Sequence, residues 1–300
     1  RADITDAAEM DQVFATHQPD AVMHLAAESH VDRSIDGPAE FVRTNVLGTF
    51  IILEAARHYH DGLAGRRRAA FRFHHVSTDE VFGALAAADA PFNETTAYDP
   101  RSPYSATKAG ADHLVRAWFH TYGLPTIVSN TCNNYGAWQF PEKLIPLVTL
   151  HALEGRTLPV YGDGSHRRDW LFVDDHAEAL VRVLERGTPG ATYAIGARQP
   201  RSNLQVVQAI CKHLDRRRPD SAGPRERLIR FVTDRPGHDF RYEIDPTRAE
   251  AALGWSAPHD FETGLARTID WYLEHRDWWE AVRTARYAGQ RLGITSGATA

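Results

Sequence analysis

The polar residues at the end of an apolar run, residues 71–80, have the side chains best suited to acid–base chemistry. The run begins at Phe71, predicts a strand, and stops at the sequence Ser-Thr-Asp-Glu over 77–80. Ligands of open α/β sheets bind just beyond the carboxyl ends of strands. Thr78, Asp79 and Glu80 are therefore candidates for proton transfer. Taken alone, the two carboxyl groups are better explained as a solvated turn after the strand.

A second chemical pair, Tyr104 and Lys108, stands four residues apart in a predicted helix over 103–122 and so shares one helix face. A free phenol titrates near pH ~10 and is a poor base at neutral pH. A cation one turn away favours the phenolate, so we expect Lys108 to lower the pKa of Tyr104. A tyrosine packed at a helix start beside an exposed lysine is the alternative. The position of the pair after the polar strand end favours the chemical interpretation of both motifs.

The elements that must position these groups alternate between strand and helix. This order predicts right-handed crossovers and a doubly wound parallel sheet of the Rossmann type, within an α/β fold. We expect strands at 20–27, 71–76 and 126–130, and helices at 6–16, 38–59 and 103–122. Loops are expected at 28–34 and 84–101. Beyond a turn at 132–136 we expect helices at 142–154, 174–186, 204–214, 247–253 and 261–275, strands at 158–161, 191–195, 230–233 and 241–244, and a partly mobile tail at 283–300.

Three polar residues in apolar segments need partners if these elements are buried. Asn45 interrupts the apolar face of the helix over 38–59. His74 and His75 are neighbours in one strand and point to opposite faces, so they cannot jointly bind a metal. We expect them to be core or interface histidines.

Composition excludes several classes of protein. The 300 residues carry a net charge of −5 and only two cysteines, Cys132 and Cys211. The charge argues against a general nucleic-acid or membrane-surface binder. Two cysteines exclude a disulfide framework and a multi-cysteine zinc site, and fit a reducing cytoplasm. No apolar run approaches the ~20 residues of a membrane span. We expect a cytoplasmic protein with no metal.

The beginning of the chain lacks the glycine-rich phosphate loop that a dinucleotide-binding fold normally has. It starts at Arg1, and no glycine-rich phosphate loop occurs in the sequence, although the alternating segments from residue 6 onward are typical of the middle of a dinucleotide-binding fold. We therefore expect the first one or two β-α units, of ~30 residues each, to be missing from a truncated chain.

Eight segments between residue 2 and about residue 271 resemble the extended short-chain dehydrogenase/reductase superfamily. Within it, they resemble the nucleotide-sugar 4,6-dehydratases that act on dTDP-glucose. The Tyr-x-x-x-Lys pattern marks only the superfamily, whereas Thr-Asp-Glu at the strand end separates dehydratases from epimerases. The segments are residues 25–34, 45–49, 77–83, 102–108, 133–136, 140–146, 168–171 and 234–238.

The resemblance implies a reaction and a role for each catalytic candidate. With NAD as cofactor, Tyr104 would take the proton of the hydroxyl on sugar carbon 4, with Lys108 beside it and Thr78 hydrogen-bonded near that carbon. Glu80 would remove the proton on carbon 5, and Asp79 would protonate the departing hydroxyl on carbon 6. This chemistry requires one carboxyl ionised and its neighbour protonated, and proximity of two acids separates their pKa values.

The resemblance also implies binding residues, domains and a homodimer. We expect an NAD-binding Rossmann domain over 1–132, to which 170–200 returns, and a smaller α/β domain over 133–300 that mainly binds the nucleotide sugar. Helices 41–59 and 103–122 would form the homodimer contact. Arg168 can hold a phosphate bidentately and Lys143 as a point charge. The cofactor residues would be Asp3, Ile4, Leu25, Ala26, Ala27, Ser29, Thr44, Tyr104, Lys108 and Asn134. The substrate residues would be Ser29, Thr78, Asn133, Lys143, Leu144, Pro159, Tyr161, Arg168, Asn203, Arg235 and His238.

Two alternatives remain open from the sequence. One is a related dehydratase or 4-epimerase that uses another nucleotide sugar. The other is a non-catalytic remnant that binds nucleotide but cannot hold NAD, because the helix N-terminus that normally receives the pyrophosphate is missing.

Overall fold

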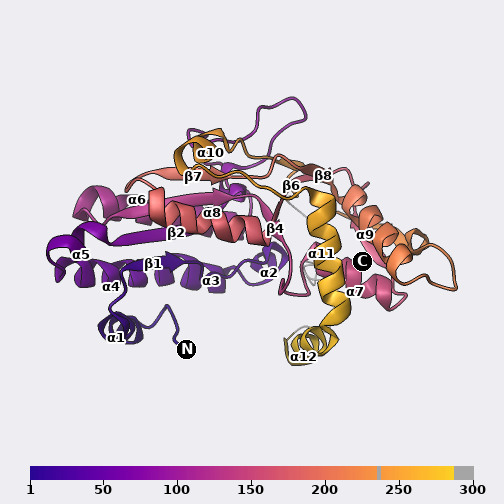
Figure 1. The fold of residues 1–300 in the computed structure, drawn as a ribbon, viewed down its shortest axis with the longest axis horizontal. Helices are drawn as coiled ribbons and strands as arrows, with labels where there is room; N and C mark the ends of the chain where they lie inside the picture. The colour runs from indigo at the N-terminus through magenta and orange to yellow at the C-terminus, as the bar shows by residue number, and fades with distance from the viewer. Residues whose placement is uncertain (235–237, 287–300) are drawn as a thin grey trace, which may run out of the picture.

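A four-stranded parallel sheet organises the first part of the chain in the computed structural model, which describes residues 1–234 and 238–286 (Figure 1). The strand order is β1-β2-β3-β7. Neighbouring strands pair in parallel register, for example His75 with Val128. The prediction of an α/β fold with a parallel sheet is therefore confirmed. The strands are β1 (Ala21–His24), β2 (Arg72–Thr78), β3 (Thr126–Thr131) and β7 (Thr192–Ile195).

Helices cover both faces of this sheet. Ile127 and Val128 are neighbours in β3 and point to opposite faces, and each belongs to a different apolar core. One core joins the sheet to α1 (Ala7–His17), α4 (Thr49–Asp61) and α6 (Pro103–Tyr122). The other joins it to α8 (Val173–Arg186) and α10 (Thr247–Leu253). The central strands β2 and β3 are therefore buried on both faces, and their polar side chains need partners inside the protein.

Helix α6 begins and ends where local signals place it. The Ser102 hydroxyl accepts from the Ser105 amide at 3.1 Å, and the Ser105 hydroxyl accepts from the Ser102 amide at 3.0 Å, which forms a capping box. Pro103 occupies the first turn. Gly123 adopts the left-handed conformation, φ 69°, that terminates many helices. The predicted bounds 103–122 are confirmed, and the cap places Tyr104 in the first turn.

The predicted helix over 38–59 is a composite. It consists of α3 (Pro38–Phe41), a π-helical segment η1 (Val42–Gly48) and α4. Within η1, the Asn45 side chain accepts from the Glu28 amide at 2.9 Å and donates to the Glu28 carbonyl and the Thr107 hydroxyl, both at 3.0 Å. The partner expected for Asn45 is thus the loop after β1 together with α6.

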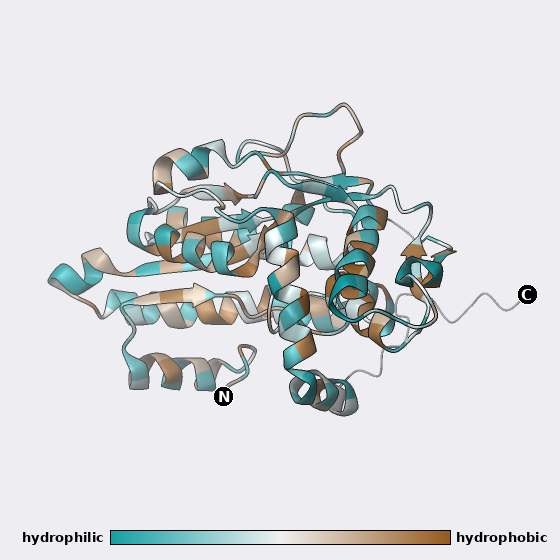
Figure 2. Cartoon of the chain, turned by 45° about the vertical axis from the view of Figure 1, so that its right-hand side comes forward, coloured by the Kyte–Doolittle hydropathy of each residue, from teal (hydrophilic) through white to brown (hydrophobic). Residues whose placement is uncertain are grey.

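The second part of the chain gathers on the right of Figure 1 around α7 (Leu144–Leu153), α9 (Asn203–Arg217) and α11 (Phe261–Glu274). These helices share one apolar core with β5 and β6. In Figure 2 they carry brown, apolar stretches beside teal, polar ones, as helices with one buried face should. Strand β6 (Arg167–Phe172) pairs with β4 (Asn133–Tyr135), β8 (Pro200–Ser202) and β10 (Arg241–Tyr242), and β5 (Leu158–Tyr161) pairs with β9 (Ile229–Val232).

Several predicted elements are wrong in extent or type. The strand over 20–27 stops at His24 and lies at the edge of the sheet among the described residues. The loop over 28–34 contains α2 (Val31–Asp36), and the turn over 132–136 contains β4. The tail begins inside α12 (Arg276–Arg286), and its remaining residues lie outside the described part of the chain. The other elements are α5 (Gly65–Ala70), η2 (Asp79–Phe82) and η3 (Arg225–Leu228).

The length and apolar character of the helices decide whether any of them could cross a membrane. Within residues 1–234 and 238–286, none of them combines the length and the apolar character that crossing a bilayer requires.

Candidate active site

The end of β2 and the start of α6 meet at one buried place. Thr78 is the last residue of β2, and its hydroxyl accepts from the Glu80 amide at 3.2 Å, which folds the chain into the 3-10 turn η2. The same hydroxyl hydrogen-bonds the phenol of Tyr104. Tyr104 also lies within the electrostatic influence of Asp79 and Glu80. The four side chains therefore lie together at one place, where the sequence predicted a shared site.

Asp79 has the surroundings of a neutral acid. It is 1% exposed. Burial, reinforced by the charge of Glu80, raises its pKa well above the ordinary value, against the opposing charge of Arg168. One carboxyl oxygen contacts the Thr78 hydroxyl at 3.4 Å, and the other has no hydrogen-bond partner among the residues that the structure describes. A protonated carboxyl with an unused oxygen is a suitable proton donor.

The pKa of Tyr104 is raised in this structure, not lowered as the sequence predicted. Burial raises the pKa of Tyr104, the charge of Glu80 adds to the rise, and the hydrogen bond with Thr78 opposes it. The Lys108 ammonium instead donates to the Val76 carbonyl at 2.9 Å. Burial lowers the pKa of Lys108 to about 8. The sequence spacing of Tyr104 and Lys108 shows neither the burial of the phenol nor the nearby carboxylate of Glu80. The direction of the pKa shift could therefore not be predicted from it.

A buried carboxylate, Asp112, lies one further turn along α6. It is 0% exposed, and one of its oxygens is 3.2 Å from Nε2 of His75. The other accepts from the Tyr98 hydroxyl at 2.7 Å and from Nδ2 of Asn130 at 3.0 Å. Burial would raise the pKa of Asp112, but the hydrogen bond with His75 and the charge of Lys108 hold it below its usual value.

Asp112 is therefore an ionised group that opposes the loss of the proton from Lys108. Sequence reasoning missed it. The signal was present, because Tyr104, Lys108 and Asp112 follow one another at intervals of four residues along one helix face.

A cavity of about 750 Å³ opens beside the site. Glu80 lines it, which connects the polar strand end to the space where a substrate could lie. Thr78 is not among its lining residues, and Arg235 lies outside the described residues. Nine predicted substrate residues line the cavity: Ser29, Asn133, Lys143, Leu144, Pro159, Tyr161, Arg168, Asn203 and His238.

Two cationic side chains of the cavity wall are held by backbone carbonyls. The Lys143 ammonium donates to the Ser29 carbonyl at 2.8 Å. The Arg168 guanidinium donates to the Asp239 carbonyl at 2.9 Å and lies 4.2 Å from the centroid of the Tyr242 ring. Positioned positive charge of this kind suits the phosphates of a nucleotide.

The predicted cofactor residues lie along the same edge of the sheet and beside η1. Leu25, 54% exposed, and its neighbours Ala26 and Ala27 follow β1, which pairs with β2. Ile4 packs against Gly48 of η1, the segment that also carries Thr44. Asn134 follows β3, and its side-chain oxygen is buried without a hydrogen-bond partner among the described residues. Asp3 is exposed and accepts from the Thr5 hydroxyl at 2.8 Å.

Further cavity residues were missed as site residues, although some lie in the segments that carry the resemblance. His30, Asp32 and Glu142 line the cavity. Burial raises the pKa of Glu142, although Arg33 donates to its carboxylate at 2.9 Å. Tyr242 lines the opposite wall and donates to the Asp239 carboxylate. These contacts join segments far apart in sequence, so only the fold could assign them to one cavity.

Comparison with known proteins gives consistent results. A family model described as GDP-mannose 4,6 dehydratase matches residues 1–268. A dTDP-glucose 4,6-dehydratase from Escherichia coli is 55% identical over 304 residues, which cover 98% of this chain and 84% of the relative.

Solved structures give the same grouping. A double mutant of a dTDP-glucose 4,6-dehydratase from Streptomyces venezuelae, with NAD and DAU bound, matches with a TM-score of 0.84 and 40% identity, covering 94% of this chain and 81% of the other. A UDP-glucose 4-epimerase from Thermotoga maritima, solved with UDP-glucose, matches with a TM-score of 0.80 and 26% identity, covering 91% and 83%. The fold is therefore shared by dehydratases and epimerases, and the site has to distinguish them.

Proposed function

We propose that this chain, which belongs to the GDP-mannose 4,6-dehydratase family, removes water from dTDP-glucose to give dTDP-4-keto-6-deoxyglucose. One observation carries the choice of reaction: Asp79, whose pKa burial raises, is buried next to Glu80 and Tyr104 at the end of β2. An elimination needs an acid and a base together, whereas oxidation and reduction at carbon 4 alone need neither of these carboxyl groups. The relatives at 55% identity carry the same activity in their name.

The cofactor is NAD, and the residues at the sheet edge fit it. Oxidation at carbon 4 and reduction at carbon 6 are the chemistry that it supplies when bound, so the reaction consumes no NAD. Its holding residues are Asp3, Ile4, Leu25, Ala26, Ala27, Ser29, Thr44 and Asn134, together with Tyr104 and Lys108. A bound cofactor would cover the exposed apolar side chain of Leu25. It would also offer a hydrogen bond to the buried side-chain oxygen of Asn134, which lacks a partner among the described residues.

Tyr104 takes the proton from the hydroxyl on carbon 4. Because burial raises its pKa, the phenolate form needs positive charge nearby. Lys108, one turn along α6, supplies that charge, and Thr78 hydrogen-bonds both the phenol and the sugar. The pair thus acts through the charge of Lys108, which has to keep its proton for Tyr104 to lose one.

Asp79 and Glu80 divide the elimination between them. The ketone at carbon 4 acidifies the proton on carbon 5, and ionised Glu80 removes it. The C6–O bond breaks as Asp79 transfers its proton to the departing hydroxyl, which leaves as water. Burial of Asp79 holds that proton until it is needed.

The remaining cavity residues hold the nucleotide. Arg168 and Lys143 face the diphosphate with positive charge, and His238 lines the same cavity. Asn133, Tyr161 and Asn203 offer polar contacts, and Leu144 and Pro159 offer apolar ones. A cavity of about 750 Å³ is within the range of small-molecule sites and accommodates a nucleotide sugar.

The test is a product assay with NAD and dTDP-glucose. Dehydration yields a ketone that absorbs in alkali, while a 4-epimerase yields the 4-epimer and no such absorbance. Tyr104→Phe should abolish turnover and leave nucleotide binding near normal. Tyr122→Phe, on an exposed tyrosine of the same helix, serves as the matched control. Formation of the 4-epimer, or full activity in Tyr104→Phe, would overturn the proposal.

Three broader features complete the proposal. Exposed apolar side chains on the two long helices, Val42, Leu47, Phe50 and Tyr122, suit a homodimer built from these helices. Equilibrium sedimentation should give two copies, and a monomer would refute the dimer.

The two buried free cysteines suit the cytoplasm. Residues 1–132, to which 170–200 returns, would form the NAD domain, and 133–300 mainly the nucleotide-sugar domain.

A further inference from the structure

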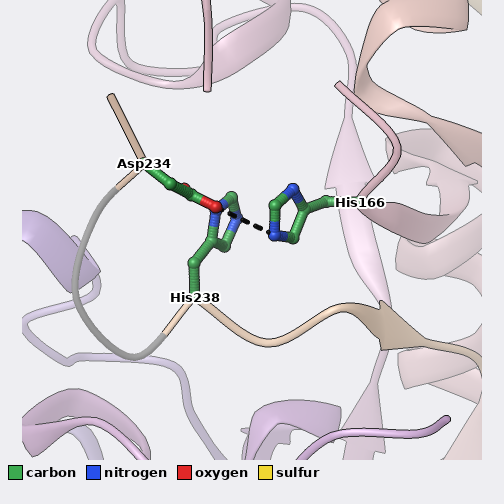
Figure 3. Close-up of side chains that lie close together, drawn as sticks. All are labelled: His166, Asp234 and His238. Carbon is green, nitrogen blue, oxygen red and sulfur yellow. Dashed lines mark hydrogen bonds and ion pairs between the residues drawn. The ribbon is translucent and has the colours of Figure 1, made fainter. Parts of the chain in front are cut away.

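Two histidines and an aspartate meet at the edge of the cavity, apart from the groups that transfer protons (Figure 3). His166 precedes β6, Asp234 follows β9, and His238 precedes β10. One ligating atom from each lies within 4.8 Å of the others, and within residues 1–234 and 238–286 this is the one group of such side chains that comes so close. His238 lines the cavity itself.

The aspartate contacts one nitrogen of each ring. One Asp234 oxygen is 2.6 Å from Nδ1 of His238, and the other is 3.2 Å from Nε2 of His166. The rings stack with centroids 3.8 Å apart and planes 10° apart. Neutral imidazole and carboxylate are the forms that bind divalent transition metals.

The backbone around two of the rings is already fixed. The Arg167 amide donates to the Phe240 carbonyl at 2.8 Å, and the Asn203 amide donates to the His166 carbonyl at 2.9 Å. A tight turn at Gly162 packs against Asp234, since a Cβ there would lie 3.3 Å from the carboxylate. Paired strands and a close-packed turn thus hold the three side chains together, which lowers the cost of assembling a metal site.

We propose that His166, Asp234 and His238 bind one divalent transition-metal ion of the zinc type, with water as the fourth ligand. In a tetrahedral site with bonds of ~2.0–2.1 Å, neighbouring ligand atoms lie roughly 3.3 Å apart. The contact of 3.2 Å between Asp234 and His166 is close to that spacing, and the contact of 2.6 Å between Asp234 and His238 is shorter. Binding replaces the shared protons with the metal and opens the shorter contact. The sequence did not indicate this site, because His166 lies far from Asp234 and His238 along the chain.

Metal binding has a consequence for the cavity, and this consequence rests on the proposed function. A nitrogen of His238 that coordinates a metal cannot donate a hydrogen bond to the nucleotide sugar. Zinc should therefore inhibit competitively. Metal binding itself is measured without turnover, so its failure is distinct from failure of the proposed reaction.

The experiment is calorimetric titration of the full chain with zinc chloride in buffer free of chelators. One zinc ion should bind per chain. His166→Gln and Asp234→Asn should each weaken binding at least tenfold. His213→Gln is the matched control, because His213 pairs with Asp270 at 3.2 Å but belongs to no such three-residue group among the described residues. It should bind zinc as the unaltered chain does. In assays, zinc should inhibit the unaltered chain and not His166→Gln.

A second measurement needs no variant. Cobalt chloride added to the unaltered chain should produce the visible absorption of low-symmetry cobalt with nitrogen ligands, and zinc should abolish it. Absence of saturable binding and of that absorption would overturn the site. Equal zinc affinity in the unaltered chain and in folded His166→Gln would overturn it as well.

Discussion

Glu80 and Asp79 are adjacent in sequence and differ in surroundings. Asp79 is buried, and burial raises its pKa, whereas Glu80 is half-buried and lines the cavity. That difference assigns the acid to Asp79 and the base to Glu80. The sequence alone could not assign these roles. It shows that the two carboxyl groups are neighbours, but not which of them is exposed to water.

The assignment predicts a specific defect in Glu80→Gln. The variant keeps the size of the side chain and loses the base, so oxidation at carbon 4 should proceed while loss of water stops. The measurement is exchange of the carbon-5 proton with deuterated solvent, followed by mass spectrometry, and the rate should fall by about 10²–10⁴-fold. Glu185→Gln, on an exposed carboxylate of α8, is the control. Exchange at the unaltered rate would remove Glu80 from the mechanism.

Asp112 acts on the substrate only through Lys108. Burial lowers the pKa of Lys108 to about 8, and the charge of Asp112 works against that fall. In Asp112→Asn the opposing charge is gone, so Lys108 loses its proton at lower pH. The alkaline limb of the pH profile of kcat should move to lower pH by about one unit.

A purely structural role for Asp112 would give a different profile, with kcat lowered equally at every pH and the alkaline limb unmoved. Asp175→Asn provides a matched loss of buried charge away from the site, since Asp175 is 2% exposed and pairs with His259 at 2.6 Å. Its pH profile should keep the shape of the unaltered chain.

At the scale of elements, the sequence predicted the helix ends that contacts between near neighbours in the chain determine. The capping box, the proline and the left-handed glycine fixed α6 to the residue. Strand β4 and helix α2 were missed because their partners are distant: β4 pairs with β6. The π-helical turn of η1 likewise depends on Asn45 reaching Glu28 and Thr107, which no spacing within residues 38–59 reveals.

The central sheet and helix α8 contain histidines that burial keeps neutral. Burial lowers the pKa of His74 to about 3 and those of His75 and His176 to about 4. The unfolded chain binds protons at these groups below pH ~6.5, and the folded chain does not until lower pH. The free energy of unfolding should therefore fall as pH decreases from about 6.5 towards about 4.

His176→Gln tests this at one group of α8. Between pH 7 and pH 5 a single such histidine should account for about 2 kcal/mol of the lost free energy of unfolding. The difference between urea unfolding at the two pH values should shrink by about that amount in the variant, whatever its stability at pH 7. His17→Gln, on an exposed residue of α1, should leave the difference unchanged. An unchanged difference in His176→Gln would contradict the neutral state of the buried ring.

At the scale of the whole molecule, the cavity lies where the end of the parallel sheet meets the second group of helices and strands. Nine substrate residues that the resemblance implied line one cavity, although they extend from Ser29 to His238. The contacts of Asp112 with His75 and of Asp234 with His166 were not predicted, because only folding brings these partners together. The sequence therefore predicted the type of reaction, but not the buried contacts that shift the pKa values of the site residues.

The most direct test of the proposed reaction follows one hydrogen through the sugar. The chain is incubated with NAD and dTDP-glucose that carries deuterium on carbon 4, and the product is analysed by mass spectrometry and NMR. The proposed mechanism predicts a 4-keto-6-deoxy sugar with that deuterium on carbon 6, because the hydride leaves and returns within one site. Deuterium retained on carbon 4 of an epimer, or a keto product that has lost it to solvent, would contradict the mechanism.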